Sequence, residues 1–382
     1  MGWRLAFACA LASGCAAVAQ LPQPLPAVAS QPVEQDHYPA PPFRFANGVR
    51  GVPAVVYRTQ PGYRPLTLDL YLPPATARKP AHGFPLVVYI HGGALGGDWM
   101  GGDSRRSGVF VDFPAVLAAL AARGYVVAAV DYRLSSVAIF PAQIQDVKAA
   151  IKFLRLHAAG YAIDPARAIA WGASAGAHLA ALAAVSCGAQ PLEPRQTTPP
   201  ATPENPAGTA APSDVAVDVS DCVQASVAWF GVFDMATIQV QARQDGATSR
   251  DQPDAPEWRL LGCFAGQCSE GQLAAASPVA YVNAQCQCSE GQLAAASPVA
   301  YVNAQTPPML LIVGDQDKTV PQQQTLEMAE TLKQAGVEHE LMVIPGVGHA
   351  FIGKTPAETR DANLAALEAT FRFIDQTMHA AQ

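Results

Sequence analysis

The chain has 382 residues, half of them hydrophobic, and it carries a formal net charge of −7 with a pI near 5.6. This length allows one large domain or two smaller ones, and the apolar content is sufficient for a large core. Nucleic-acid binding finds no support, because no cluster of basic residues offers a surface for phosphates.

The first segment, residues 1–19, is predicted to be a signal peptide. It is apolar apart from a charge at Arg4, and Ala-Val-Ala before Gln20 is typical of a signal-peptidase site. The alternatives are a lipoprotein signal, in which Cys15 carries the lipid, and a buried N-terminal helix. A signal of either kind predicts a secreted, periplasmic or lipid-anchored protein. No later segment has the length and hydrophobicity of a membrane span.

Residues 20–42 are rich in proline and are predicted to be a disordered spacer, and residues 43–382 alternate strands with helices. An antiparallel pair of edge strands is expected first, at 52–58 and 66–73. The later elements are a strand at 84–93, a helix at 113–124, a strand at 125–133, a helix at 141–160, a strand at 167–174, a helix at 175–186, strands at 223–231 and 307–315, a helix at 322–336, a strand at 338–346 and a helix at 362–380. Apolar strands that alternate with helices predict an α/β fold with a mostly parallel, doubly wound sheet covered on both faces.

An insert at residues 188–221 interrupts this pattern. It is heavy in proline, alanine and threonine, and such a composition cannot bury enough apolar surface to order itself. We expect a surface loop, with a substrate lid as the alternative. In an exported chain a disulfide between Cys187 and Cys222 is expected to close its neck, and this bond contributes about 3–4 kcal/mol on the chain-entropy model.

A second interruption is a segment that occurs twice within residues 267–305, with an offset of 20. Solenoid repeats diverge and recur at least three times, so a recent tandem duplication or an error of sequence assembly explains the two identical copies better. Without one copy an even set of cysteines remains, in which Cys263 pairs with Cys268 in a small loop. We expect the extra copy to protrude from the surface and Cys286 and Cys288 to be adventitious.

A serine stands between two glycines where a predicted strand meets a predicted helix. Gly-Ala-Ser-Ala-Gly, residues 172–176, matches the pattern Gly-x-Ser-x-Gly in the strand–turn–helix setting that this pattern requires. The small neighbours allow a sharp turn that exposes Ser174, and the N–H of Ala175 then points into the same space. We predict that Ser174 is a nucleophile; the alternative is a purely structural serine.

A serine hydroxyl needs a base, and the base needs an acid that orients it. His349 follows the last predicted strand in a glycine-containing loop, at the edge of the sheet where ligands bind in open α/β folds. The alternative for this residue is an exposed loop histidine. Candidate acids at strand ends are Asp315 and Asp317, with Asp234 as a further candidate. His178 lies one turn into the helix after the serine, where we expect it to pack. The histidines without a comparable setting are His37, His82, His157, His339 and His379.

A glycine-rich segment, His-Gly-Gly-Ala-Leu-Gly-Gly-Asp-Trp, follows the strand at 84–93. Glycines let the main chain approach a substrate, and N–H groups placed there stabilise an oxyanion by about 3–4 kcal/mol per donor. The candidate donors are Gly93 and Ala94, together with the N–H after the serine, and His91 is expected to brace the loop. Trp99 is a candidate for the substrate pocket, with an exposed surface aromatic as the alternative.

These residues resemble the α/β-hydrolase superfamily, and more narrowly the bacterial esterases of the hormone-sensitive-lipase and feruloyl-esterase-like branches. The matching pieces lie between Phe84 and Phe351, and they are HGG, DYRL, FPAQIQDVKAAIKFLR, GASAGAHLA, ASPVAYV, GDQDKTVP and GVGHAF. The resemblance implies an α/β-hydrolase fold with the triad in the order serine, aspartate, histidine, and it assigns the acid to Asp317 of D-x-x-V-P. The chain departs from the family at Ala94, where the third glycine of HGGG usually stands.

The predicted function is that of an exported serine esterase, a carboxylic ester hydrolase that acts on small acyl or aryl esters, free or polymer-linked, through an acyl-enzyme intermediate. This chemistry requires no metal and no organic cofactor, and the cysteines lack the spacing of a zinc site. The alternatives are a serine peptidase of the prolyl-oligopeptidase type, which shares the triad and the sheet, and a non-catalytic binding protein on a hydrolase scaffold.

Overall fold

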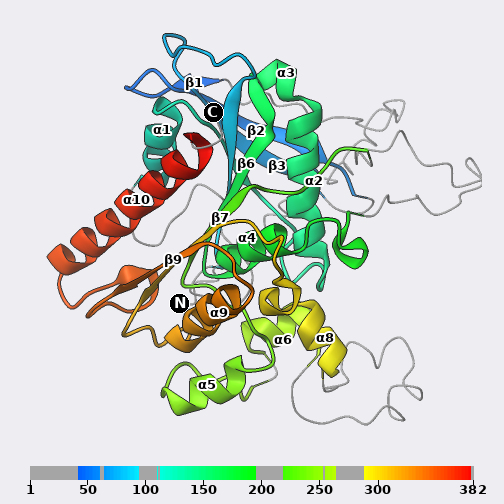
Figure 1. Ribbon diagram of the computed structural model, residues 1–382, viewed down its shortest axis with the longest axis vertical. Helices are drawn as coiled ribbons and strands as arrows, with labels where there is room; N and C mark the ends of the chain where they lie inside the picture. Colours follow the sequence, from blue (N-terminus) through cyan, green and yellow to red (C-terminus); the bar gives the residue numbers. More distant parts are fainter. Residues whose placement is uncertain are drawn as a thin grey trace, which may run out of the picture. The chain divides into compact units, whose positions relative to one another are not determined.

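A mixed β-sheet forms the centre of the part of the chain that the computed structural model describes (Figure 1), namely residues 42–60, 64–93, 110, 112–194, 218–252, 254–263 and 288–379. Its strands lie in the order β1-β2-β3-β5-β4-β6-β7-β8-β9. The strands from β5 to β9 in this order are parallel, and β1, β2 and β3 pair antiparallel. Their bounds are β1 Phe43–Arg44, β2 Arg50–Arg58, β3 Leu66–Leu72, β4 Phe84–Ile90, β5 Val126–Val130, β6 Ile163–Ala173, β7 Ala225–Trp229, β8 Met309–Gly314 and β9 His339–Ile344. The predicted α/β architecture with an antiparallel N-terminal strand pair is confirmed.

Helices cover both faces of the sheet, and the side chains that alternate along each strand pack against the helices of one face or the other. In β4, Leu86, Val88 and Ile90 pack on the side of α2, α4 and α9, and Val87 and Tyr89 pack on the side of α1 and α10. Figure 1 shows α1 and α10 together on one side of the strands. The helix bounds are α1 Phe113–Ala122, α2 Ala142–Leu156, α3 Ala158–Tyr161, α4 Ala175–Val185, α5 Ile238–Gln244, α6 Pro256–Leu261, α8 Glu290–Ala295, α9 Gln322–Gln334 and α10 Pro356–His379, with short 3₁₀ turns η1 Gln190–Leu192, η3 Pro298–Tyr301 and η4 His349–Phe351.

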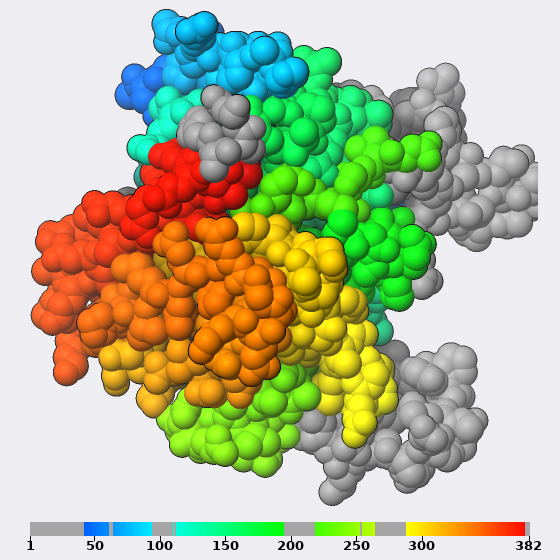
Figure 2. All heavy atoms as spheres, viewed as in Figure 1, coloured from blue at the N-terminus to red at the C-terminus, as the bar shows by residue number. Residues whose placement is uncertain are grey.

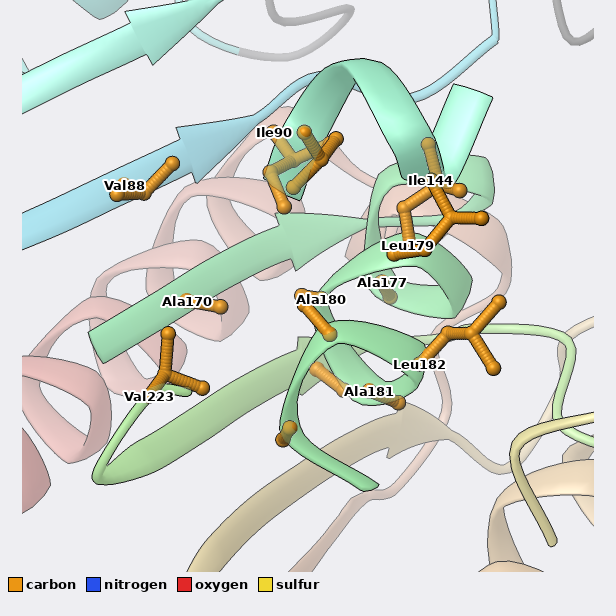
Figure 3. Packing of buried hydrophobic residues seen from close by; sticks show 14 of the residues in the cluster. Val88, Ile90, Ile144, Ala170, Ala177, Leu179, Ala180, Ala181, Leu182 and Val223 are labelled. Carbon is orange, nitrogen blue, oxygen red and sulfur yellow. The ribbon is translucent and has the colours of Figure 1, made fainter. Parts of the chain in front are cut away.

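Helix α4 follows β6 directly and is buried along its whole length. More than half of its residues are alanines, and these small side chains let the helix lie close to the strands. Figure 3 shows Ala180 of α4 near Ala170 of β6, and Leu179 belongs to the same buried cluster as Ile144 of α2. Dense packing on both sides therefore fixes the first turn of α4 relative to the sheet.

Asp146 of α2 is buried and binds two arginine side chains from different elements. Its Oδ1 accepts a hydrogen bond from Nη1 of Arg58 at 2.8 Å, and its Oδ2 accepts from Nε of Arg133 at 2.7 Å. Arg58 ends β2 and Arg133 follows β5, so one carboxylate ties two strand ends to the helix that covers them. Because the carboxylate is fully buried, the charges depend on one another for solvation.

The neck of the proline-rich insert is closed by a disulfide between Cys187 and Cys222. Beside it, the buried ammonium of Lys148 lies 2.6 Å from Oδ2 of Asp221, which joins the neck to α2. Residues 195–217 of the insert lie outside the described residues, and the predicted surface loop, or lid, lies there with them.

The second disulfide joins Cys263 to Cys288, which corrects two expectations from the sequence. Cys263 does not pair with Cys268 in this structure, and Cys288 is a structural residue that is 4% exposed rather than an adventitious one. The expectation assumed that the second copy of the duplicated segment protrudes, whereas this copy packs against the fold. Cys268 and Cys286 lie outside the described residues.

The described part of the second copy, residues 288–305, packs beside α9. Helix α8 opens it with a capping box formed by Ser289 and Gln292. Further along, Oγ of Ser297 accepts the N–H of Met235 at 2.9 Å, which anchors the copy to the loop that follows β7. In Figure 2 the yellow surface of this copy adjoins the orange surface of α9. Side-chain capping and a buried hydrogen bond therefore keep this copy in place.

We expect Cys263 to pair with Cys268 in the variant Cys288→Ser, because the two copies are identical in sequence. Stability should fall less than in Cys263→Ser, where neither copy can form the bond and roughly 2–5 kcal/mol is lost. Digestion of the unreduced protein at glutamates tests the pairing, since residues 258–270 form one peptide that holds both cysteines. A free Cys263 in Cys288→Ser, with stability as low as in Cys263→Ser, contradicts this expectation.

Candidate active site

Ser174 lies in the turn between β6 and α4 with a backbone conformation that disfavours a side chain. Its φ is 54° and its ψ is −121°. Its N–H donates to the carbonyl of Trp229 at 2.8 Å, and its carbonyl accepts the N–H of His178 at 3.1 Å. The end of β7 and the first turn of α4 therefore hold the turn from both sides. Such strain costs about 1–3 kcal/mol and persists only where the surroundings impose it.

Two glycines make this turn possible by close approach. A Cβ atom on Gly176 would lie 2.0 Å from the carbonyl oxygen of Ile90, and one on Gly172 would lie 2.1 Å from the carbonyl oxygen of Gly176. No side chain fits at these distances. Glycine at both positions is therefore what allows α4 to begin directly against the ends of β4 and β6.

The imidazole of His349 joins Ser174 to Asp317. Its Nε2 lies 3.1 Å from Oγ of the serine, and its Nδ1 lies 2.8 Å from Oδ2 of the aspartate. The side chain of Asp317 is fully buried, and its Oδ1 accepts the N–H groups of Thr319 and Val320 at 2.8 and 2.9 Å. The carboxylate favours the tautomer that carries the proton on Nδ1, so that Nε2 presents its lone pair to the hydroxyl.

The loop of His349 is held by an aromatic ring and by α10. The ring of Phe230 meets the imidazole edge-on, with 4.6 Å between the centroids. The side-chain amide of Asn363 in α10 donates to the carbonyl of Ala350 at 3.3 Å. These contacts come from elements that the sequence motifs do not include, and they restrict the imidazole to the side of the serine.

The two other candidate aspartates accept hydrogen bonds from backbone N–H groups. Oδ1 of Asp315 accepts the N–H of Gly346 at 2.7 Å, and Oδ1 of Asp234 accepts the N–H of Ala236 at 2.7 Å. Asp317 is the carboxylate that the structure brings against the imidazole. The choice among the three follows from the loop geometry, since all three residues lie at or near strand ends.

Main-chain segments lie on two sides of the candidate nucleophile. Ala175 is the first residue of α4, so its N–H has no carbonyl one turn earlier to bind. The segment after β4 passes against the turn, because a Cβ atom on Gly92 would lie 2.6 Å from the oxygen of Ala173 and 3.2 Å from Cβ of Ser174. Gly93 is the next residue along this segment. Gly93 and Ala175 are thus the two candidate oxyanion donors that lie within the described residues.

His91 braces this segment, as expected from the sequence. Its ring stacks on that of Tyr132 with 4.5 Å between centroids and 13° between planes. The hydroxyl of Tyr132 donates to the carbonyl of His91 at 3.0 Å. Burial raises the pKa of this tyrosine, so the hydroxyl remains a donor at all relevant pH values. The end of β5 thereby fixes the main chain next to Gly92.

His178 is a buried residue of α4, and burial lowers its pKa from 6.5 to about 4. Its Nδ1 donates to the carbonyl of Val232 at 2.9 Å. Between these two pKa values the unfolded chain binds more protons than the folded one, so stability falls as the pH decreases through this window, by about 3 kcal/mol in total. We expect His178→Gln to lose this contribution to the pH dependence.

Denaturant unfolding of both proteins, at intervals from neutral pH to about pH 4, measures this difference. The wild-type stability should fall more steeply on the acid side than that of His178→Gln. Parallel curves for the two proteins contradict a neutral buried imidazole.

Two of the predicted site residues, Ala94 and Trp99, lie outside the described residues. Within the described ranges no group of three or more His, Cys, Asp or Glu side chains is arranged to hold a metal ion. No helix in these ranges combines the length and the hydrophobicity that a bilayer span requires.

Comparison with protein families gives two matches. The model of the family described as BD-FAE matches residues 68–289, more than half of the chain. The model of the prolyl oligopeptidase family matches residues 278–380, which include Asp317 and His349.

Among curated proteins, the chain is similar to two esterases of Mycobacterium tuberculosis. Esterase LipQ is 28% identical over 316 residues, which make up 82% of this chain and 60% of the relative. Esterase LipC is 27% identical over 285 residues, which make up 74% of this chain and 56% of the relative. The chain therefore spans somewhat more than half the length of these relatives.

Among solved structures, a truncated carbohydrate esterase from gut microbiota has a TM-score of 0.56 and 23% identity, and the match covers 87% of this chain and 98% of that chain. The esterase Est2 of Thermogutta terrifontis in its propionate-bound form has a TM-score of 0.55 and 24% identity, covering 85% of this chain and 93% of that chain. These likenesses show that the chain has the fold of esterases of the α/β-hydrolase type.

Proposed function

Because the chain belongs to the BD-FAE family, we propose that it is a carboxylic ester hydrolase with Ser174 as nucleophile, His349 as general base and Asp317 as the residue that orients the imidazole. Its substrates are small acyl or aryl esters, free or linked to a polysaccharide. The names of the mycobacterial relatives and the solved esterases of the same fold support this assignment.

The geometry supports a two-step reaction. Oγ of Ser174 attacks the ester carbonyl carbon while Nε2 of His349 takes its proton, and the bond to the alcohol then breaks as the imidazole returns that proton to the leaving oxygen. Water attacks the acyl-enzyme in the second step and gives a proton to Nε2, and the bond from the acyl carbon to Oγ then breaks as the imidazole returns that proton to Oγ, which frees the acid and restores the serine. The N–H groups of Ala175, Gly93 and, on the sequence prediction, Ala94 stabilise the oxyanion in both steps.

One observation carries the proposal: a single imidazole lies 3.1 Å from a strained serine hydroxyl and 2.8 Å from a buried carboxylate. A serine hydroxyl is a weak nucleophile by itself, and this arrangement supplies both the proton acceptor and its orientation. The hydroxyl, the imidazole and the carboxylate come from distant parts of the sequence. A binding protein without catalytic activity does not require them to be in hydrogen-bonding contact.

A serine peptidase is the second candidate, since the prolyl oligopeptidase model matches the part of the chain that holds the acid and the base. Peptide amides have a poorer leaving group than esters, so the two activities separate readily in an assay. The discriminating feature is the substrate, because both classes use the same triad.

A substrate panel tests the proposal on the full chain. It compares p-nitrophenyl acetate, butyrate and octanoate, methyl ferulate, acetylated xylan and a glycyl-prolyl anilide, each with Ser174→Ala as the matched blank. We expect hydrolysis of the short esters, loss of that activity in the blank, and little turnover of the anilide. Preferred cleavage of the anilide supports the peptidase instead, and equal rates for wild type and blank overturn both.

We also propose that the protein is exported, with residues 1–19 as a signal peptide or with Cys15 as a lipidated residue. The two disulfides are compatible with an oxidising compartment. Mass spectrometry of the mature N-terminus tests the proposal: a chain that starts at Gln20, or a lipidated Cys15, supports it, and an intact N-terminus in the cytoplasm overturns it.

A further inference from the structure

The turn that carries Asp317 is bound by residues 248–250, which lie between α5 and α6. Both the N–H and the hydroxyl of Thr248 donate to the carbonyl of Lys318, at 2.7 and 2.9 Å. Nη2 of Arg250 donates to the carbonyl of Thr319 at 2.6 Å. Two successive carbonyl groups of the turn are therefore bound by one short segment.

The same two peptide groups hold the carboxylate of Asp317 at their other ends. One contains the oxygen of Lys318 and the N–H of Thr319, and the next contains the oxygen of Thr319 and the N–H of Val320. Both N–H groups donate to Oδ1 of Asp317, at 2.8 and 2.9 Å. A peptide group is planar, so binding its oxygen also fixes the direction of its N–H. Hydrogen bonds at the two ends of one peptide group also polarise one another.

Arg250 is itself fixed before it reaches the turn. Its Nε and Nη2 donate to the two carboxylate oxygens of Glu257, each at 3.1 Å, and Nη1 donates to the carbonyl of Thr248 at 2.6 Å. The side chains of Arg250 and Glu257 are both 3% exposed. A planar guanidinium with all of these contacts has one orientation available, and that orientation directs a charge-assisted donor at the carbonyl of Thr319.

We propose that Arg250 is a positioning residue of the triad: through the peptide group of Thr319 it holds Oδ1 of Asp317, so that Oδ2 faces Nδ1 of His349. The inference rests on the proposed function, because it concerns the orientation of the general base. The α5–α6 segment is then part of the catalytic apparatus, although none of its residues touches the serine or the imidazole in the contacts described above.

A purely structural role makes a different prediction. Replacing a buried ion pair by apolar side chains of similar volume is often neutral for stability. If Arg250 and Glu257 serve only packing, the double variant Arg250→Met/Glu257→Met keeps the activity of the wild type. If Arg250 positions the acid, the same variant stays folded and the imidazole loses part of its orientation.

The experiment compares wild type, Arg250→Lys and the double variant by the pH dependence of kcat and KM for p-nitrophenyl acetate. Their thermal unfolding is measured in parallel. We expect kcat in the double variant to fall by about 10- to 100-fold with KM little changed. The acid limb of kcat/KM should move to lower pH, because a poorly placed carboxylate favours the protonated imidazole less. Lysine keeps a cationic donor, so the kcat and the acid limb of Arg250→Lys should lie between those of the wild type and the double variant.

A matched control lies next to this segment, in α5. Arg243 pairs with Asp251 at the surface, with side chains 57% and 39% exposed, and Arg243→Met should leave kcat and the pH profile unchanged. Should the double variant fail to fold, Arg250→Lys carries the comparison. An unchanged acid limb and kcat in the folded variants overturn the inference.

A second readout is independent of catalysis. The proton on Nδ1 of an imidazole bonded to a carboxylate gives a strongly deshielded NMR signal, which we expect in the wild type and expect to be weakened or lost in the double variant. If the wild type hydrolyses no ester but shows this behaviour, the proposed function fails and the positioning role stands. A signal that is absent from the wild type, or identical in the double variant, overturns the role.

Discussion

In Ser174→Ala, kcat for p-nitrophenyl acetate falls by about 10⁴- to 10⁶-fold, while KM changes little. Alanine removes the oxygen that lies 3.1 Å from Nε2 of His349 and leaves the rest of the site in place. The lost interaction exists only once the carbonyl is attacked, so ground-state binding is spared. Steady-state kinetics on the purified full chain measure both constants, and a fall of less than about tenfold excludes Ser174 as the nucleophile.

The companion variant Ser174→Gly separates strain from chemistry. A residue with φ 54° and ψ −121° is strained if it carries a Cβ atom, and glycine adopts this conformation freely. Ser174→Gly should therefore be as inactive as Ser174→Ala but about 1 kcal/mol more stable, after allowance for the greater entropy of glycine in the unfolded chain. Denaturant unfolding compares the two, and a glycine variant less stable than the alanine variant contradicts a strained turn.

The largest loss of stability is expected in Asp146→Asn. The amide keeps the shape of the carboxylate but removes the charge that faces Arg58 and Arg133 at 2.8 and 2.7 Å. Removing one member of a buried ion pair costs about 3–5 kcal/mol, because the remaining charge stays buried after losing the carboxylate that faced it. Arg58 is only 2% exposed, so its guanidinium cannot reach water without movement of β2 or α2.

Equilibrium unfolding by guanidinium chloride measures this loss. The matched control is Asp361→Asn, whose carboxylate pairs with Arg360 at a position where both side chains are 66% exposed. That change should stay within about 0.5 kcal/mol of the wild type. A loss in Asp146→Asn no larger than in the control contradicts the role given to the buried carboxylate.

Much of the fold follows from local patterns in the sequence. The apolar run of β4 predicts a strand buried on both faces, and its side chains do alternate between two cores. The small residues around Ser174 predict the turn, because Gly172 and Gly176 belong to one motif, although the atom that excludes a side chain at Gly176 is the carbonyl oxygen of Ile90 in β4. Helix α10 begins earlier than expected, at Pro356, because proline fits the first turn of a helix that the apolar periodicity alone places later.

Other features depend on contacts that no local pattern contains. Helices α5, α6 and α8 have seven, six and six residues, and helices this short form only where tertiary contacts hold them. The predicted bond between Cys263 and Cys268 was wrong. Each of the two identical copies offers a cysteine at the same place, and sequence alone cannot choose between Cys268 and Cys288. The contact of Arg250 with the turn of Asp317 joins residues 69 positions apart, and no motif marks it.

The account depends most on the activation of Ser174 by His349. Paraoxon tests this directly, and it is the reagent in a structure of the phosphorylated esterase of Thermogutta terrifontis. Intact-mass and peptide analysis after treatment should find one diethylphosphoryl group, on Ser174, in the wild type. The account predicts no adduct in Ser174→Ala and a rate lower by several orders of magnitude in His349→Ala. An adduct on another residue, or labelling of His349→Ala at the wild-type rate, contradicts it.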